Sequence, residues 1–541
     1  MQFSRLTAAR SANRRGRNSS GHGGRRIALA ALCTLVFLTF LDNTIVSVGL
    51  GSVQTDLKAG VSDLQWVVGG YALSFASIML ACGMIGDELG RKAVMLTGAG
   101  VFCAGSVLCA LAPNVDTLIA GRVIMGLGAA ASEPGTLSML RHIYADERAR
   151  TRAVGVWAAT TGLALALGPV VGGALVGAWN WRGIFWFNLF FGLAALIAAL
   201  IVLPESSNPE AARVDTLGTF LGAGALALLV FAIIDAETVG FGAPLVIGLL
   251  CAAVLLGIVF VWWELRVPHP LLDLHYLRIP QFGAANVVAC CTYFATFAIF
   301  FFTALYLNEV SNASGYRIAE AFAPMTVLMI AASLLSGVWT SASGPRWPVT
   351  TGCALFAGGL LLATLFLHPS PDYLPLAVAL AVAGTGIGIT IVPITSSVLA
   401  VVPPERSGMA ASATNTSREI GAVTGVAVLG ALVYGQLTTS LTHRFVELGV
   451  PLVYRNLVLN ALVTGQIPQN TSQYSGYGAL VEEVINAAYS AFGDGLRSAL
   501  YVSACLVAAS GLLAAVTLRP RPTPLIASPT AADPSPNGEI S

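Results

Sequence analysis

Apolar residues recur along this chain in long runs, and polar residues gather in the stretches between them. A helix needs about 20 apolar residues to cross the roughly 30 Å hydrocarbon core of a bilayer. The first run is too long for a signal peptide and lacks a small-residue cleavage site. Runs of spanning length predict fourteen helices, at 27–49, 66–85, 94–112, 117–140, 153–177, 184–203, 216–234, 243–263, 282–307, 319–340, 348–366, 373–400, 416–436 and 497–517.

Composition agrees with this pattern, since 56% of the 541 residues are hydrophobic and only 10% are charged. Soluble domains carry about 25% charged residues, so a water-soluble enzyme is excluded. The net charge of +1 gives no sign of a nucleic-acid partner. The nine cysteines all fall in apolar runs without a CxxC pair or a histidine cluster, so we expect no metal site.

The chain has two lysines, Lys58 and Lys92, and each is followed by alanine, which bears on whether ATP could drive transport. A Walker A loop needs a Lys-Ser or Lys-Thr step. We therefore expect no ATP hydrolysis through a P-loop and no cofactor, with any uphill transport driven by an ion gradient or a partner.

Basic residues predict the orientation of the spans. With a cytoplasmic N-terminus, 21 of the 28 Lys and Arg fall in cytoplasmic segments, and the first 26 residues hold seven Arg and no acid. Arg122 lies within a span, and six lie outside: Lys58, Arg182, Arg317, Arg444, Arg455 and Arg497. This asymmetry favours an even number of spans and two cytoplasmic termini.

Three ionisable residues lie deep within the predicted spans: Asp42, Arg122 and Glu133. Such residues are costly in a bilayer and mark functional sites by default. Asp42 lies about 22 Å from the cytoplasmic end of its span, and Arg122 about 8 Å below the outer end of an antiparallel span. Both therefore lie at similar depth, and we predict that Asp42 and Arg122 share one buried polar network.

Glu133 follows Arg122 by 11 residues, or three helical turns and about 20°, so the two side chains share a face. Glu133 precedes Pro134, which frees a backbone carbonyl and can bend the helix. Burial disfavours a charged carboxylate and a nearby arginine favours it, which suits a proton carrier. The alternative is that Glu133 lies near the membrane interface and that its carboxylate reaches water without a functional role.

Two further motifs carry information by their spacing. The loop GMIGDELGRKAVML (83–96) follows the second predicted span, and its glycines allow a tight turn while its basic pair obeys the positive-inside bias. The fifth predicted span contains TGLALALGPVVGGAL (161–175), whose small residues permit close helix approach around a proline kink.

Together these motifs resemble the major facilitator superfamily, in particular its 14-span drug/proton antiporter branch. LDNTIVSVGLGSVQTDL (41–57) is similar to the acidic span-1 motif, with Asp42 at the carboxylate position and Gly51 where proline is usual. IAGRVIMGLGAAASEPGTLSML (119–140) is similar to the span-4 motif, with Met125 in place of glutamine. The loop resembles the superfamily's conformational latch at Gly83, Asp87, Gly90, Arg91 and Lys92.

Further matches extend the resemblance over about residues 27–430. WNWRGIFWFN (179–188) fits the family pattern at Trp181, Arg182, Phe185 and Asn188, and 337–346 resembles a degenerate second copy of the latch. Pro393, Gly408, Asn415, Arg418 and Gly421 also stand at matching places. The antiporter motif is matched at Gly162, Gly168, Pro169, Gly172 and Gly173.

The resemblance implies two pseudo-symmetric six-helix bundles with a two-helix insert. We expect a basic disordered tail at 1–26, an N-terminal bundle at 27–203 and a linker with two spans at 204–281. A C-terminal bundle at 282–517, with a long extracellular loop at 437–496, and a disordered tail at 518–541 should follow.

The function implied is proton-coupled export of amphipathic or cationic drugs and toxic small molecules by alternating access. Asp42, Arg122 and Glu133 are the predicted proton-coupling residues, and the protein is expected as a monomer in the inner membrane of a bacterium. Negative charge and aromatic surfaces favour lipophilic cations. Candidate cavity residues are Asn43, Tyr71, Met125, Trp157, Tyr293 and Phe297.

Four alternatives remain open. The same fold could export or flip a lipid or an endogenous metabolite, or act as a sensor, and sodium could replace the proton. A polytopic membrane enzyme is a remote alternative, because the six histidines are scattered rather than clustered near one interface.

Overall fold

The computed structural model describes residues 22–144, 146–205, 215–268, 270–271, 273–367, 373–402, 407–447 and 478–518. Within these ranges the chain forms helices and no strand. The predicted tails lie outside or almost outside the described residues, as does the middle of the predicted loop 437–496.

The first six long helices form one bundle, which we call the N-half. They are α2 (His22–Ile45), continued by η1 (Val46–Gly49) and α3 (Leu50–Leu57), and then α4 (Val61–Leu89), α5 (Arg91–Ala110), α6 (Val115–Ile143), α7 (Glu147–Ala178) and α8 (Arg182–Val202). Polar side chains begin several helices: Asn114 accepts a hydrogen bond from the Thr117 backbone N–H at 2.9 Å, and Asp146 from that of Ala149 at 2.8 Å.

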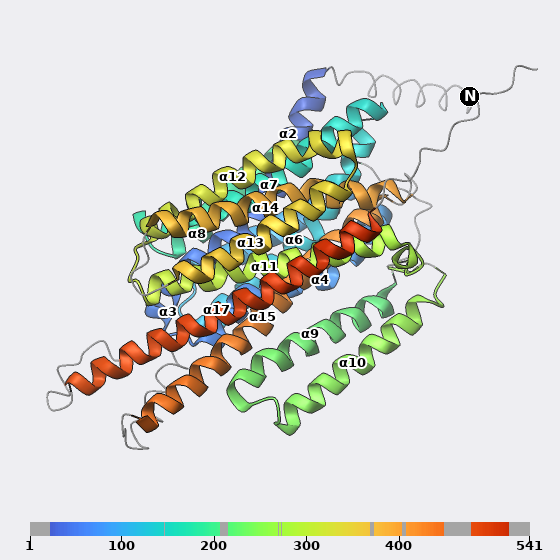
Figure 1. Ribbon diagram of the computed structural model, residues 1–541. Coiled ribbons are helices and arrows are strands. Elements are labelled where there is room, and N and C mark those ends of the chain that lie inside the picture. The colour runs from blue at the N-terminus through green and yellow to red at the C-terminus, as the bar shows by residue number, and fades with distance from the viewer. Residues whose placement is uncertain are drawn as a thin grey trace, which may run out of the picture.

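The last six long helices form the second bundle, the C-half. After a short η2 (Tyr276–Arg278) they are α11 (Pro280–Glu309), α12 (Gly315–Ser343), α13 (Arg346–Phe366), α14 (Tyr373–Ala400), α15 (Ser407–Glu447) and α17 (Gly478–Thr517). Between the halves lies the insert, α9 (Thr216–Val239) and α10 (Pro244–Glu264). Figure 1 shows this pair at one side of the bundle, and α9 packs against α4 and α15.

Helix packing repeats between the halves, as two pseudo-symmetric bundles require. In the N-half, a Cβ atom on Gly98 of α5 would lie 2.6 Å from the Gly128 carbonyl oxygen of α6. In the C-half, a Cβ atom on Gly386 of α14 would lie 2.6 Å from the Gly352 carbonyl oxygen of α13. Glycine therefore permits the closest helix approach at corresponding places.

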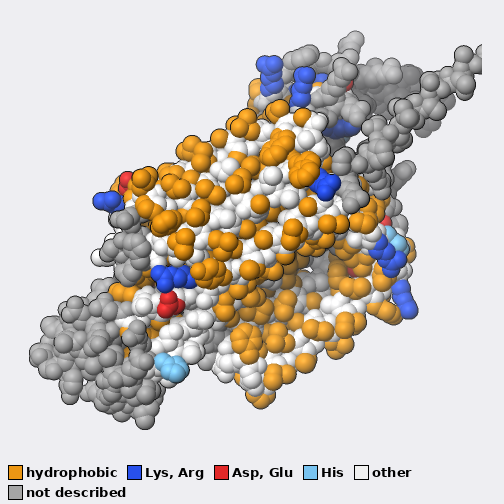
Figure 2. Space-filling view, viewed as in Figure 1, with side chains coloured by type: hydrophobic (Ala, Val, Ile, Leu, Met, Phe, Trp, Pro, Cys, Tyr) orange, Lys and Arg blue, Asp and Glu red, His pale blue; other side chains and the backbone are white. Residues whose placement is uncertain are grey.

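The described residues form fourteen long helices, which agrees with the predicted fourteen-span architecture. Thirteen described segments are long and apolar enough to cross a membrane, and α4, with 29 residues, contains the remaining predicted span. Hydrophobic side chains cover most of the visible face, and the Lys and Arg side chains lie toward its ends (Figure 2). These features define a multi-pass membrane protein.

Two helices are much longer than the spans predicted for them. α15 has 41 residues and α17 has 40, where spans 416–436 and 497–517 were expected, so both ends of the predicted loop 437–496 are helical. A 41-residue helix is about 60 Å long, roughly twice the hydrocarbon thickness. Leu437, Leu441 and Phe445 of α15 pack against Ala488 and Ala491 of α17, which supports the extension where apolar runs are short.

Candidate functional site

The predicted contact between Asp42 and Arg122 is present within the N-half. Arg122 Nη1 lies 2.5 Å from Asp42 Oδ2, and the two side chains are 1% and 0% exposed. The other Asp42 oxygen accepts a hydrogen bond from Asn188 Nδ2 of α8, and Arg122 Nε donates to the Val67 carbonyl at 2.8 Å. Helices α2, α4, α6 and α8 thus hold one ion pair away from water, where unpaired charges would be very costly.

Two predicted cavity residues, Tyr71 and Met125, are buried close to this pair. The Tyr71 ring lies under the Arg122 guanidinium, with 4.4 Å between Cζ and the ring centroid, and its hydroxyl donates to the Thr39 carbonyl at 3.1 Å. Met125, one turn from Arg122, has its sulfur 3.7 Å from that of Cys109. A stacked arginine and tyrosine stabilise each other through the cation–π interaction.

A second polar cluster lies where the two halves meet; we call it the seam cluster. Asn43 of α2 donates to Glu419 Oε1 of α15 at 2.9 Å. Asn415 of α15 donates to Glu133 Oε1 of α6 at 2.7 Å. Each half therefore supplies one carboxylate and one amide to the other, and all four side chains are buried.

Arg418 orients the C-half side of the seam cluster. Its guanidinium donates to Asn415 Oδ1 at 2.9 Å and to Thr395 Oγ1 at 2.8 Å, and it lies 5.4 Å from the Tyr293 ring centroid. Asn415 stands between Arg418 and Glu133, accepting from the first and donating to the second. Glu133 and Arg418 are thus linked through Asn415 and form no direct ion pair.

Sequence reasoning missed Arg418 and Glu419 as buried charges. Arg418 was counted with the cytoplasmic basic residues because span 13 was expected to begin at residue 416. The helix begins at Ser407, so Glu419 lies twelve residues inside it and is 1% exposed. The available signal was the family match at Asn415 and Arg418, directly before Glu419.

Arg122 and Glu133 share a helix face by their spacing but contact different partners. The 11 residues between them separate them by about 16 Å along α6. Arg122 meets Asp42 inside the N-half, whereas Glu133 meets Asn415 of the C-half. The expected direct effect of this arginine on Glu133 is therefore replaced by the Arg418–Asn415 pair.

The remaining cavity candidates divide between the two halves. Trp157 of α7 donates from Nε1 to Thr136 Oγ1 at 3.0 Å, and Thr136 follows Glu133 by three residues on α6. Tyr293 and Phe297 lie one turn apart on α11, with ring centroids 6.4 Å apart. Of the six candidates, Asn43 belongs to the seam cluster, and Tyr293 lies beside Arg418.

The glycine motif of α7 faces two neighbours. Thr44 Oγ1 donates to the Leu165 carbonyl at 3.0 Å, and Cβ atoms on Gly168 and Gly172 would collide with Thr44 and Ile45. These residues directly precede η1, the 3₁₀ segment that interrupts the first span after Asp42 and Asn43. A 3₁₀ stretch within a helix often marks a hinge. Glycines thus let α7 approach the span at this break.

The other face of the motif meets the C-half. A Cβ atom on Gly173 would lie 3.0 Å from the Ala319 backbone nitrogen of α12, and one on Gly162 would lie 3.1 Å from Ser333 Oγ. Thr326 of α12 donates to the Ala166 carbonyl at 2.6 Å. Pro169 lies inside α7 between these contacts. The motif therefore joins the first span to the opposite half.

The predicted latch forms the turn between α4 and α5. Gly90 has φ +115°, a conformation that side chains disfavour, and Gly344 has φ +76° at the corresponding turn of the C-half. Arg91 begins α5, and Lys92 donates from its backbone to Glu205 Oε1 at 3.3 Å and from Nζ to the Leu200 carbonyl at 2.8 Å.

The other latch residues lie on α4. A Cβ atom on Gly83 would lie 3.5 Å from Pro134 and 3.8 Å from Ser412 Oγ of α15, so the motif approaches the C-half. The Asp87 side chain lies outside the described residues.

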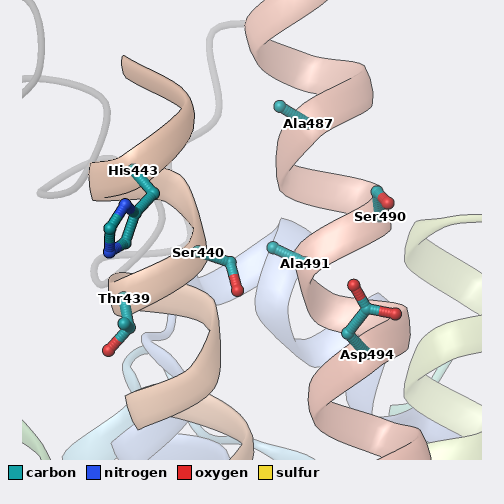
Figure 3. Close-up of a pocket in the computed structure, with 7 residues that line it drawn as sticks. All are labelled: Thr439, Ser440, His443, Ala487, Ser490, Ala491 and Asp494. Carbon is teal, nitrogen blue, oxygen red and sulfur yellow. The ribbon is translucent and has the colours of Figure 1, made fainter. Parts of the chain in front are cut away.

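A cavity of about 430 Å³ lies between the extended ends of α15 and α17, remote from both clusters. It is bordered by Thr439, Ser440, His443, Ala487, Ser490, Ala491 and Asp494 (Figure 3). No residue predicted from the sequence lines it.

The helical architecture and the buried charges define the class of this protein as a multi-pass membrane transporter. Residues 32–426 match the Major Facilitator Superfamily, and the chain belongs to this family. Its relatives include the multidrug resistance protein Stp of Mycobacterium tuberculosis, 31% identical over 87% of this chain and 88% of that protein. The methylenomycin A resistance protein of Bacillus subtilis is 34% identical over 75% of this chain and 88% of its own length.

Further comparisons agree on family and fold. The drug efflux pump JefA of Mycobacterium tuberculosis is 31% identical over 90% of this chain and 97% of its own length. A bacterial homologue of the human lysosomal transporter Spinster, solved in an inward-facing, unoccupied conformation, superimposes with a TM-score of 0.61 at 18% identity. That alignment covers 92% of this chain and 98% of the other, and it shows the shared fold.

Proposed function

We propose that this protein is a proton-coupled exporter of amphipathic or cationic drugs and other toxic small molecules. The relatives whose names describe drug efflux or antibiotic resistance support an export function. We place it as a monomer in the cytoplasmic membrane of a bacterium, with both termini in the cytoplasm. The proton gradient supplies the energy, and no ATP or cofactor takes part.

The Asp42–Arg122 ion pair carries the proposal for proton coupling. It is shielded from water, and Asp42 is followed directly by Asn43, which crosses to Glu419 of the C-half. A proton from outside neutralises Asp42 and weakens its attraction to Arg122. The segment of α2 around Asp42 and Asn43 then shifts, and the crossing hydrogen bond changes with it.

This local change biases the two-state equilibrium between inward-open and outward-open arrangements. A ligand moves such an equilibrium only through its different affinity for the two states, so proton and cargo must act on the same element. The break at η1 and the glycine contacts of α7 give α2 a place to bend. Cargo leaves outward, Asp42 releases its proton to the cytoplasm, and the cycle resets.

The test uses everted membrane vesicles and the Asp42→Asn variant. Wild-type vesicles with an acid interior should accumulate a lipophilic cation and release protons in a cargo-dependent way. Asp42→Asn should lose both responses because its side chain cannot be deprotonated. Asp494→Asn, at a half-exposed acid on α17, is the matched control.

Three results of this assay would each contradict a part of the proposal. Full accumulation and cargo-dependent proton release by Asp42→Asn would reject Asp42 as the coupling group. A requirement for sodium at constant pH would replace the proton as coupling ion. Transport of defined lipids in place of the drug would assign the fold to lipid or metabolite export.

A further inference from the structure

The seam cluster has hydrogen-bonding capacity that the described part of the chain does not use. Asn43 Oδ1, Glu133 Oε2, Glu419 Oε2 and the Tyr293 hydroxyl are buried without a hydrogen-bond partner. Each of these four side chains is at most 3% exposed. A buried polar atom without a partner costs free energy, and such groups in a native protein point to a missing partner.

The missing partner is a donor. Carboxylate oxygens and the amide oxygen only accept hydrogen bonds, so three of the four unused atoms require an N–H or O–H group. Helix geometry brings them together, because Asn415 and Glu419 lie four residues apart on one face of α15. Glu133 and Asn43 are bound to that same face from α6 and α2.

Charge narrows the chemistry of that donor. The cluster has two carboxylates, Glu133 and Glu419, but one guanidinium. That guanidinium, of Arg418, donates its hydrogen bonds to Asn415, Thr395 and the Ile391 carbonyl. Among the described residues neither carboxylate has a basic side chain within ion-pair distance, whereas Asp42 has one. A positively charged donor would bring the cluster closer to neutrality.

We propose that Glu133, Glu419 and Asn43, with the Tyr293 hydroxyl and ring, bind the protonated amine of a cationic cargo through its N–H bonds. The site therefore selects amines that carry an N–H and disfavours quaternary ammonium groups, which have none to donate. This inference rests on the proposed export function and specifies its substrate class. Because carboxylates from α6 and α15 hold one amine, the cargo joins the two halves.

The test measures binding of three matched probes to the purified full-length protein without any proton gradient. The probes are 4-phenylbutylamine, whose protonated form has three N–H bonds, its quaternary analogue N,N,N-trimethyl-4-phenylbutylammonium, and neutral 4-phenylbutanol. Because hydrogen bonds to charged groups are stronger than those between neutral groups, we expect the amine to bind about tenfold or more tightly than the quaternary probe. The alcohol reports contacts that do not depend on charge.

Two conservative variants locate the effect. Glu419→Gln and Glu133→Gln should each weaken amine binding about tenfold and change alcohol binding by less than about twofold. Glu320→Gln, at an exposed glutamate of α12, is the matched control and should leave all three affinities unchanged. Size-exclusion profiles and thermal unfolding confirm that each variant is folded.

The proposal is overturned if the amine and the quaternary probe bind equally well, if neither binds, or if folded Glu419→Gln and Glu133→Gln retain wild-type amine affinity. Failure of the export function is a separate result, since it appears as absent gradient-driven transport in vesicles. A protein that binds the amine selectively but transports nothing would keep this site and lose the exporter assignment.

Discussion

The N-half and the seam contain similar side chains in different arrangements. In the N-half, Arg122 contacts Asp42 directly and stacks on Tyr71. At the seam, Arg418 lies near Tyr293 but reaches Glu133 only through Asn415. The Asn415 amide thus separates the arginine from the carboxylate at the seam, whereas the two charges touch in the N-half.

The second difference is where the partners come from. Both Asp42 oxygens accept hydrogen bonds from donors within the N-half. Glu133 and Glu419 each accept a hydrogen bond at one oxygen only, from a donor in the opposite half. A complete network rigidifies the element that holds it, and a partly satisfied one favours a ligand or a rearrangement. The N-half pair is therefore suited to sense a proton, and the seam to hold what is transported.

The largest expected effect breaks the N-half pair. Asp42→Ala leaves Arg122 buried without its counter-charge and should lower the free energy of unfolding by about 3–5 kcal/mol. The double variant Asp42→Ala/Arg122→Met should lose clearly less, because no buried charge remains. Thermal unfolding of the purified single and double variants measures the coupling. Additive losses in the double variant would show that the pair is not an interacting unit.

The Asp42–Arg122 contact was accessible to sequence reasoning because it depends on depth. Counting residues from opposite ends of two antiparallel spans placed both at one level, and the structure confirms the contact. The fourteen long helices followed similarly from apolar runs of membrane length. The shared depth and the number of spans need only local arithmetic, whereas the contact between α2 and α6 is shown by the structure.

The seam was not accessible because it depends on which helices touch. Glu133 and Asn415 are 282 residues apart, and no pattern in the sequence around either residue indicates that α6 and α15 are in contact. Glu419 was missed because α15 begins nine residues before its apolar run, with small and polar residues that a hydropathy count does not assign to a span. Tertiary packing rather than composition extends that helix.

A medium effect is expected where the halves meet on the opposite side, between α7 and α12. Gly173→Ala places a Cβ atom 2.7 Å from that of Ala319 and should destabilise the protein by about 1–3 kcal/mol through overpacking. Gly155→Ala is the matched control on the same helix, because a Cβ atom there meets nothing within 4 Å. Helix propensity predicts that the control gains up to about 1 kcal/mol.

Thermal unfolding therefore tests whether the same Gly→Ala change lowers stability at residue 173 and raises it at residue 155. Vesicle transport should fall in Gly173→Ala and stay at the wild-type level in Gly155→Ala. If both variants gain stability, the contact between α7 and α12 is looser than the structure has it, and the glycine motif loses its role in joining the halves.

The smallest difference in stability is expected between two asparagine variants, because each loses one hydrogen bond to a buried carboxylate. Asn188→Ala removes the second donor to Asp42, and Asn415→Ala removes the donor to Glu133, so each should cost about 1–3 kcal/mol. Their consequences differ because Asn188 lies within one half and Asn415 bridges two. Amide hydrogen exchange in α15 should therefore increase in Asn415→Ala, since the halves separate more readily, and stay unchanged in Asn188→Ala. Equal exchange in both variants would mean that the Asn415 bond does not hold the halves together, and the distinction between a sensing pair and a bridging cluster would fail.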